Sequence, residues 1–234
     1  MSVSHPRLLA VVPWVVAATA LPSRAATLVN GSFENLSSSY VNTPGADLMS
    51  GVAADGWTVS SNSPDWYLGA PGPSGFWFTP WGDFFTVGAS VGTGYREGIS
   101  QTITGMTIGK TYTLEFQQAN GLRFDQGSYI GVGHAGGWEI LLDGGSILSS
   151  DSLNDNSTPA PSFPGSWNLG SVSFVATATS QTVEFLAYGG SATDPTFQFL
   201  DSVILTESQV PEPGVSTLIA LAGLGFWRRR PRSK

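Results

Sequence analysis

The chain has 234 residues, of which 41% are hydrophobic and only 12% charged, and its formal net charge is −7. It contains no cysteine, which excludes a disulfide framework and thiolate chemistry. Because 29 glycines and 15 prolines accompany so few charges, the composition favours an all-β domain with many turns over a helical bundle. The length suits one sandwich-sized domain or at most two small ones.

Residues 1–25 have the order of a secretory signal peptide. Arg7 precedes an apolar run over residues 8–21, and small residues follow it. We place the cleavage after Ala25, and a cut after residues 18–20 is the alternative. An uncleaved anchor helix is the other interpretation, but the run is shorter than the ~20 residues that a bilayer needs. The segment therefore predicts export.

Residues 26–208 form the expected domain, in which short apolar strands alternate with turns. The clearest strand segments are 96–105, 110–120, 136–150, 167–190 and 196–208. In the second segment Tyr112, Leu114 and Phe116 share one face, since side chains of a strand repeat with a period of two. Many short strands with regular turns predict an antiparallel sandwich or barrel.

Two of these segments each predict a hairpin. Asp143-Gly144-Gly145 divides the segment 136–150, and such a sequence favours a tight turn. The segment 167–190 predicts a second hairpin with its turn near Thr179. Its expected inward residues are Val172, Phe174 and Ala176 on one arm and Val183, Phe185 and Ala187 on the other.

Three short motifs resemble those of a known family. "NGSFE" at 30–34, "GISQTITGMTIGKTYTLEFQQ" at 98–118 and "FQFLDSVIL" at 197–205 resemble, in order, the opening, middle and closing segments of jelly-roll carbohydrate-binding modules related to galactose-binding-like domains. The resemblance implies an all-β fold, an antiparallel β-sandwich of the jelly-roll, galactose-binding-like type. It also implies that the domain binds a glycan.

The same resemblance implies a structural Ca²⁺. In those modules the Glu of the opening motif and the Asp of the closing strand meet the ion, and Glu34 and Asp201 are the matching residues here. Two carboxylates with main-chain carbonyls suit a hard cation that takes about six to eight oxygens. The alternative is that both carboxylates are solvated at strand edges, or that Glu34 caps a turn.

An aromatic stretch over residues 57–85 is the main candidate for ligand binding. It holds nine aromatic side chains interleaved with Pro, Gly and Asp, and three of them are consecutive at 76–78, so they cannot all face one core. Exposed rings beside acidic acceptors suit sugars. The predicted platform consists of Trp66, Tyr67, Trp77 and Trp81, with Asp65 and Asp83 as acceptors. The alternative is a long loop that buries its own aromatics over the sandwich.

Catalytic motifs are missing from the sequence. His134 is the single histidine after residue 25, it lies in a glycine-rich stretch, and no G-x-S-x-G elbow accompanies it. Zinc sites need several His or Cys ligands. No pair among the acidic residues stands out for glycoside hydrolysis. The sequence therefore predicts a protein that is not an enzyme.

Residues 209–234 combine Pro211-Glu212-Pro213, an apolar run over 214–227 and a basic cluster that starts with Arg228, Arg229 and Arg230. A helix of about 14 residues spans ~21 Å, which is short of the ~30 Å hydrocarbon core. The three features resemble the PEP-CTERM sorting signal of Gram-negative bacteria, in which an exosortase of the inner membrane recognises the tripeptide and removes the tail. The resemblance implies transient membrane insertion, with the arginines as the stop signal. A plain C-terminal anchor is the alternative.

The net charge between the predicted signal peptide and the sorting tripeptide limits the kinds of partner that the domain can bind. Residues 26–210 contain three basic and sixteen acidic side chains, a net charge of −13, which excludes nucleic-acid binding. Two hypotheses follow for a protein at the cell surface or in the extracellular matrix. The first is a binding module for exopolysaccharide or another glycan, and the second is a non-catalytic structural protein of the biofilm or surface. An enzyme that acts on extracellular polysaccharide ranks third.

Overall fold

We describe the fold from a computed structural model of the chain. The structure describes residues 25–35, 48–68, 81, 84–92, 94–121, 123–125, 128–130, 134–151, 167–191 and 193–208. These residues form strands and turns, and none of them lies in a helix that is long and apolar enough to cross a membrane. The predicted signal peptide, except for Ala25, and the whole sorting segment lie outside the described residues.

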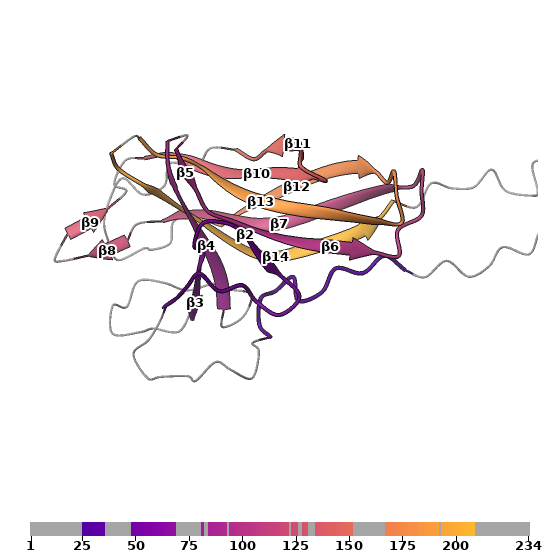
Figure 1. Cartoon of the computed structure of the whole chain (residues 1–234), viewed down its shortest axis with the longest axis horizontal. Coiled ribbons are helices and arrows are strands. Elements are labelled where there is room, and N and C mark those ends of the chain that lie inside the picture. Colours follow the sequence, from indigo (N-terminus) through magenta and orange to yellow (C-terminus); the bar gives the residue numbers. More distant parts are fainter. Residues whose placement is uncertain are drawn as a thin grey trace, which may run out of the picture.

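The strands form two large antiparallel sheets that pack face to face (Figure 1). In spatial order, one sheet contains β1 (Leu48–Ser50), β3 (Asp65–Leu68), β4 (Phe84–Val91), β14 (Thr196–Glu207), β7 (Thr111–Gly121) and β12 (Asn168–Val175), and β5 (Tyr95–Arg96) joins it beside β4. The other contains β11 (Gly145–Ser149), β10 (Gly136–Leu142), β13 (Ser180–Gly189), β6 (Gly98–Thr104) and β2 (Thr58–Ser61). A separate pair consists of β8 (Arg123–Asp125) and β9 (Ser128–Ile130). The predicted antiparallel sandwich is confirmed.

The apolar core lies between the two sheets, as the period of two predicts. Tyr112, Leu114 and Phe116 are fully buried on β7, and Phe185 of β13 meets them from the five-stranded sheet. The rings of Phe116 and Phe185 are edge to face with their centroids 5.1 Å apart. Burial of these aromatic and aliphatic faces holds the sheets together.

One predicted hairpin is confirmed and the other is wrong. β10 and β11 pair through the turn at Asp143 and Gly144, which have φ values of 49° and 81°. By contrast, β12 pairs with β7, whereas β13 pairs with β6 and β10. The chain therefore crosses from one sheet to the other near Thr179. The predicted inward residues of both arms are buried, because alternation specifies the face of a strand but not its neighbour.

The interior changes character along the strands. Towards one end, the inward side chains are amides and hydroxyls, all of them buried: Gln118, Asn120, Thr196 and Gln198. The Asn120 amide donates to Thr196 Oγ1 at 3.2 Å, and the Gln198 amide donates to the same oxygen at 2.9 Å. We call this the loop end, because the turn after β4 and the end of β13 lie there.

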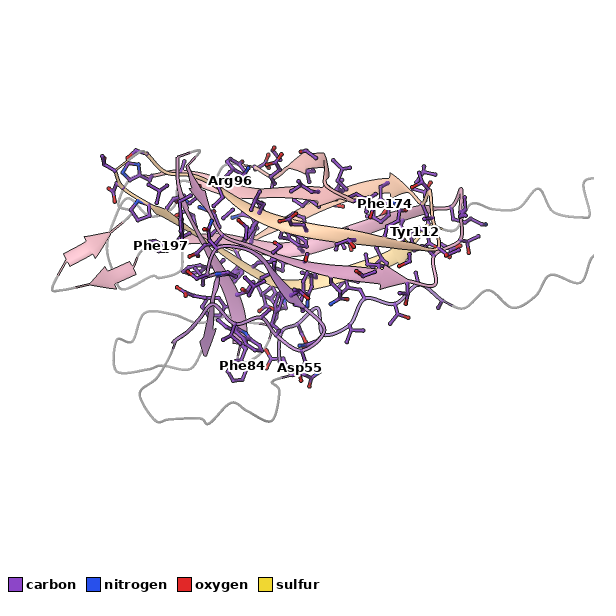
Figure 2. All side chains as sticks on the ribbon, viewed as in Figure 1. Asp55, Phe84, Arg96, Tyr112, Phe174 and Phe197 are labelled. Carbon is purple, nitrogen blue, oxygen red and sulfur yellow. The ribbon has the colours of Figure 1, made fainter. Side chains whose placement is uncertain are left out.

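The opposite end carries the first and the last described segments, and we call it the terminal end. Thr27 forms a bridge with Thr104, and the Ser208 N–H donates to the Thr111 carbonyl at 2.8 Å. Figure 2 shows Tyr112 and Phe174 towards this end and Arg96 nearer the loop end. The rings of Tyr112 and Phe174 stack with a centroid distance of 6.1 Å. The amides and hydroxyls buried between the sheets are therefore gathered towards the loop end, whereas Tyr112 and Phe174 lie towards the terminal end.

Candidate functional site

A cavity of about 320 Å³ opens at the loop end. It is lined by Gly92, Arg96, Tyr188, Gly189 and Gly190, which come from the turn after β4, from β5 and from the end of β13. A volume of this size is at the lower end of the range of small-molecule sites. We call it the loop cavity.

Glycine is required on the walls of the loop cavity. Gly189 and Gly190 have φ values of +115° and +72°, a region that side chains other than glycine rarely adopt. A Cβ on Gly189 would lie 2.4 Å from the Ala135 carbonyl oxygen, and a Cβ on Gly190 would lie 2.6 Å from the Ser90 carbonyl oxygen. The backbone at both glycines therefore packs directly against neighbouring backbone atoms. The wall that these residues present to the cavity consists of peptide groups.

Arg96 places a charged group on the wall of the loop cavity. Its Nε donates to the Ala187 carbonyl at 2.7 Å, and one terminal nitrogen donates to the Leu186 carbonyl at 3.2 Å. That terminal nitrogen also lies 2.7 Å from Glu139 Oε2, and both side chains are 24% exposed. A hydrogen bond from Ser146 and the pairing with Arg96 lower the pKa of Glu139, so the carboxylate is ionised at neutral pH. The pair carries no net charge, and these contacts fix the orientation of the guanidinium on the cavity wall.

Tyr188 supplies an aromatic surface in the same cavity. Its hydroxyl donates to the Ser150 carbonyl, and burial raises the pKa of the phenol, so the ring is neutral and held in place. Chemically, the described lining of the cavity offers an aromatic ring, a guanidinium that Glu139 neutralises and backbone groups. This set suits an uncharged polyhydroxylated ligand, and the described lining residues include no nucleophile beside a general base.

Asp65 does not lie where the sequence predicts. It is 8% exposed, and its charge helps to raise the pKa of Glu97. Glu97 is 4% exposed, burial is the main cause of its raised pKa, and its carboxylate accepts from the Ala89 N–H and the Tyr95 hydroxyl, each at 2.7 Å. The assignment of Asp65 to an exposed acceptor site is therefore wrong, because its position on β3 places it against a buried carboxyl.

The predicted aromatic platform is only partly exposed. Trp66 is 3% exposed in the core, where it packs against Phe84 at 5.8 Å, so its assignment to an exposed platform is wrong. Trp81 is 38% exposed, and its ring is edge to face with Trp167 at 5.3 Å. Trp167 in turn contacts Phe85, which is buried. The side chains of Tyr67, Trp77 and Asp83 lie outside the described residues.

The two carboxylates predicted to hold Ca²⁺ belong to neighbouring segments. The Val203 N–H donates to the Gly31 carbonyl at 2.8 Å, which joins the opening motif to the closing strand. Asp201 is fully buried and accepts from the Ser202 N–H, whereas Glu34 accepts from the Phe84 N–H at 3.0 Å. The described residues contain no group of three or more His, Cys, Asp or Glu side chains that would hold a metal. Calcium binding stays a prediction.

His134 is engaged in a loop contact. Its Nε2 lies 2.8 Å from Asp194 Oδ2, and its carbonyl accepts from Asn120 and Thr196, each at 3.2 Å. These contacts tie the segment before β10 to the segment before β14. The sorting residues Pro211, Glu212 and Pro213 and the arginines Arg228, Arg229 and Arg230 lie outside the described residues.

No model of a known protein family matches the chain. In sequence, it is 30% identical over 188 residues to halomucin of Haloquadratum walsbyi. The match covers 78% of this chain, which spans about 2% of the length of halomucin.

The solved structures that resemble this chain in fold have low TM-scores. The K3 cleaved adhesin domain of Lys-gingipain from Porphyromonas gingivalis is 16% identical with a TM-score of 0.41, covering 77% of this chain and 98% of the other. TmCBM61 in complex with β-1,4-galactotriose is 16% identical with a TM-score of 0.38, covering 72% and 98%. CBM35 from Paenibacillus barcinonensis is 11% identical with a TM-score of 0.37, covering 69% and 98%. At these TM-scores and identities, the likeness carries no argument about function.

Sequence reasoning missed the loop cavity, because its residues are spread from Gly92 to Gly190. One local signal was present: Tyr188-Gly189-Gly190 places an aromatic residue directly before two glycines at the end of a strand. Such a sequence favours a ring beside exposed backbone.

Proposed function

We propose that the sandwich is a non-catalytic glycan-binding module, of the jelly-roll, galactose-binding-like type, in an exported protein. The observation that carries this proposal is the loop cavity. Its lining combines the Tyr188 ring, the Arg96 guanidinium and glycine walls in about 320 Å³, and Glu139 pairs with that guanidinium.

The chemistry of a sugar ring matches these three elements. A pyranose presents a C–H face that packs on an aromatic ring, and its hydroxyls both donate and accept hydrogen bonds. Arg96 is held by two carbonyls and Glu139, so its geometry is set before a ligand arrives. Because the ion pair has no net charge, the cavity favours a neutral hexose over a uronate. The glycine walls allow a ring to approach the backbone closely.

A glycan array followed by calorimetry on the best hit tests the proposal. We expect a defined hit and a loss of at least about tenfold in affinity for Tyr188→Ala, which corresponds to about 1.4 kcal/mol. Tyr188→Phe keeps the ring and is the matched control that should bind nearly as well. An array without a defined hit would overturn the proposed function. Unchanged binding by Tyr188→Ala with loss in Trp81→Ala would instead place the ligand at Trp81 and overturn the assignment of the loop cavity.

The proposal extends to the maturation of the protein. We propose that it is exported, that an exosortase recognises Pro211-Glu212-Pro213 after transient insertion in the inner membrane, and that the mature form reaches the cell surface or matrix. The support is the order of tripeptide, apolar run and arginines. Mass spectrometry of the exported form in its native host tests this. Recovery of peptides that span residues 223–228 would contradict processing.

Structural Ca²⁺ at Glu34 and Asp201 is part of the same proposal. The hydrogen bond between Val203 and Gly31 supports it, since it brings the two motifs together. An ion there would link the opening and closing segments and offset part of the acidic self-repulsion. We expect millimolar Ca²⁺ to raise the melting temperature relative to EDTA in the native chain but not in Asp201→Asn. Equal melting temperatures in Ca²⁺ and EDTA would remove the ion from the proposal.

A structural role at the cell surface is the second candidate. It is favoured by the sequence likeness to halomucin and by the net charge of −13 over residues 26–210. An array that is silent for every glycan, with the protein retained in the matrix fraction of its host, would favour this candidate.

A further inference from the structure

The edge strand β12 is the feature with the clearest unassigned role. It is the outermost strand of its sheet and pairs only with β7, through an uninterrupted register from Asn168↔Gln118 to Val175↔Thr111. Among the described residues, no strand pairs with its other side. A cavity of about 110 Å³ lies between this strand and the end of β11 and is lined in part by Leu169, Gly170 and Ser171.

β12 lacks the devices that usually prevent edge pairing. Its sequence, "NLGSVSFV", has no charge and no proline. Elsewhere in the described sandwich, the edge strand β11 has five residues and a register shift against β10, and the edge strand β2 has four residues and a shift against β6. β12 has eight residues in regular register.

The outer face of β12 is exposed and partly apolar. Leu169 is 62% exposed and Val175 is 53% exposed, and Ser171 and Ser173 between them are also exposed. Residues of the opposite face, such as Phe174, are buried in the core. Over residues 169–175, the strand is therefore anchored by the inward face and exposed on the outer face.

The sequence of β12 is complementary to itself. When two copies are antiparallel about a two-fold axis at Val172, Leu169 lies opposite Val175, and Ser171 lies opposite Ser173 on the same outer face. Apolar residues thus meet apolar residues and hydroxyls meet hydroxyls, which are favourable cross-strand pairs. Because the chain has a net charge of −7, two copies repel each other, and the uncharged β12 lets them meet without opposing like charges in the pairing strands.

We propose that β12 pairs with β12 of a second copy of this chain, so that the two seven-stranded sheets form one continuous antiparallel sheet. A two-fold axis makes this contact closed, and it yields a dimer and not a filament. The loop cavity lies at the end of the strands and not at this edge, so each protomer keeps its ligand site. The proposal goes beyond glycan binding and does not depend on it.

Sedimentation velocity of the full-length chain over a range of concentrations tests the proposal. We expect a concentration-dependent dimer for the native sequence and a monomer for Ser171→Lys/Ser173→Lys, since the new charges oppose one another across the axis. The matched control is Ser100→Lys/Thr102→Lys, which places the same two charges at the same spacing on β6, a strand paired on both sides. The control should dimerise like the native chain. A native chain that is monomeric throughout, or a dimer that persists in the β12 variant, would overturn the proposal.

A disulfide experiment tests the register, because the native chain has no cysteine. Opposed residues in an antiparallel pair have Cα atoms ~4.5–5.5 Å apart, within the reach of a disulfide. A mixture of Ser171→Cys and Ser173→Cys should therefore form a covalent heterodimer faster than either variant alone forms a homodimer. Equal rates in all three samples would contradict pairing about Val172.

Discussion

Two buried tryptophans give a sharp test of the packing described above. Trp138 is 1% exposed, and its indole N–H donates to the Phe199 carbonyl at 3.1 Å across the two sheets. Trp66 is 3% exposed, and its indole N–H has no hydrogen-bond partner among the described residues. Substitution by Phe removes the same atoms from each site, so the lost ring volume is matched and the difference isolates the hydrogen bond.

The hydrogen-bonding contributions to the change in stability are expected to have opposite signs in the two variants. Trp138→Phe forfeits a hydrogen bond with a net contribution of about 1 kcal/mol, whereas Trp66→Phe removes an unsatisfied buried donor that costs about 1–3 kcal/mol. We therefore expect Trp66→Phe to be the more stable variant by at least about 2 kcal/mol. For a domain of this size that corresponds to roughly 4–8 °C in melting temperature. Thermal unfolding followed by circular dichroism measures it, with Trp81→Phe as the exposed control. Equal melting temperatures for the two buried variants would refute the reasoning.

Further predictions concern the buried carboxyl and the contact between the sheets. Burial raises the pKa of Glu97 above its ordinary value of 4.5, so the stability that its protonated form provides is complete below that value and is lost as the pH rises through the raised pKa. The melting temperature of Glu97→Gln should therefore equal that of the native chain in acid and exceed it at higher pH. A difference in melting temperature that stays the same at every pH would contradict this assignment. Gly88→Ala should destabilise by about 1–3 kcal/mol, because its Cβ would lie 2.6 Å from the Trp138 ring. Urea unfolding checks this, and an unchanged midpoint would show that the ring moves aside without cost.

The sequence predicted the class of fold and the faces of the strands better than their partners. Period-two alternation identified Phe174 and Phe185 as inward residues, and both are buried, but the strands that carry them belong to different sheets. Two strands joined by a short turn pair as a hairpin or cross between layers, and the local pattern is the same in both cases. The choice depends on contacts distant in sequence.

The candidate site likewise depends on contacts between residues that are distant in sequence, which local patterns do not specify. Trp66 and Trp81 belong to one aromatic stretch, and composition cannot tell which of them faces the core. The structure separates them because Trp66 lies on β3, where it pairs with Thr86 and points between the sheets. The loop cavity joins Gly92 to Gly190, so no spacing within one segment could have identified it.

The position of the loop cavity has a mechanical consequence. The cavity lies at one end of the strands, and the last described residue, Ser208, lies at the other, bound to Thr111. A pull between a ligand in the cavity and the chain at Ser208 therefore runs parallel to β14, which is hydrogen-bonded to β4 on one side and β7 on the other. Because ladder hydrogen bonds are perpendicular to the strands, such a force shears both ladders at once and does not peel them one bond at a time. The sandwich is oriented to resist tension along its long axis.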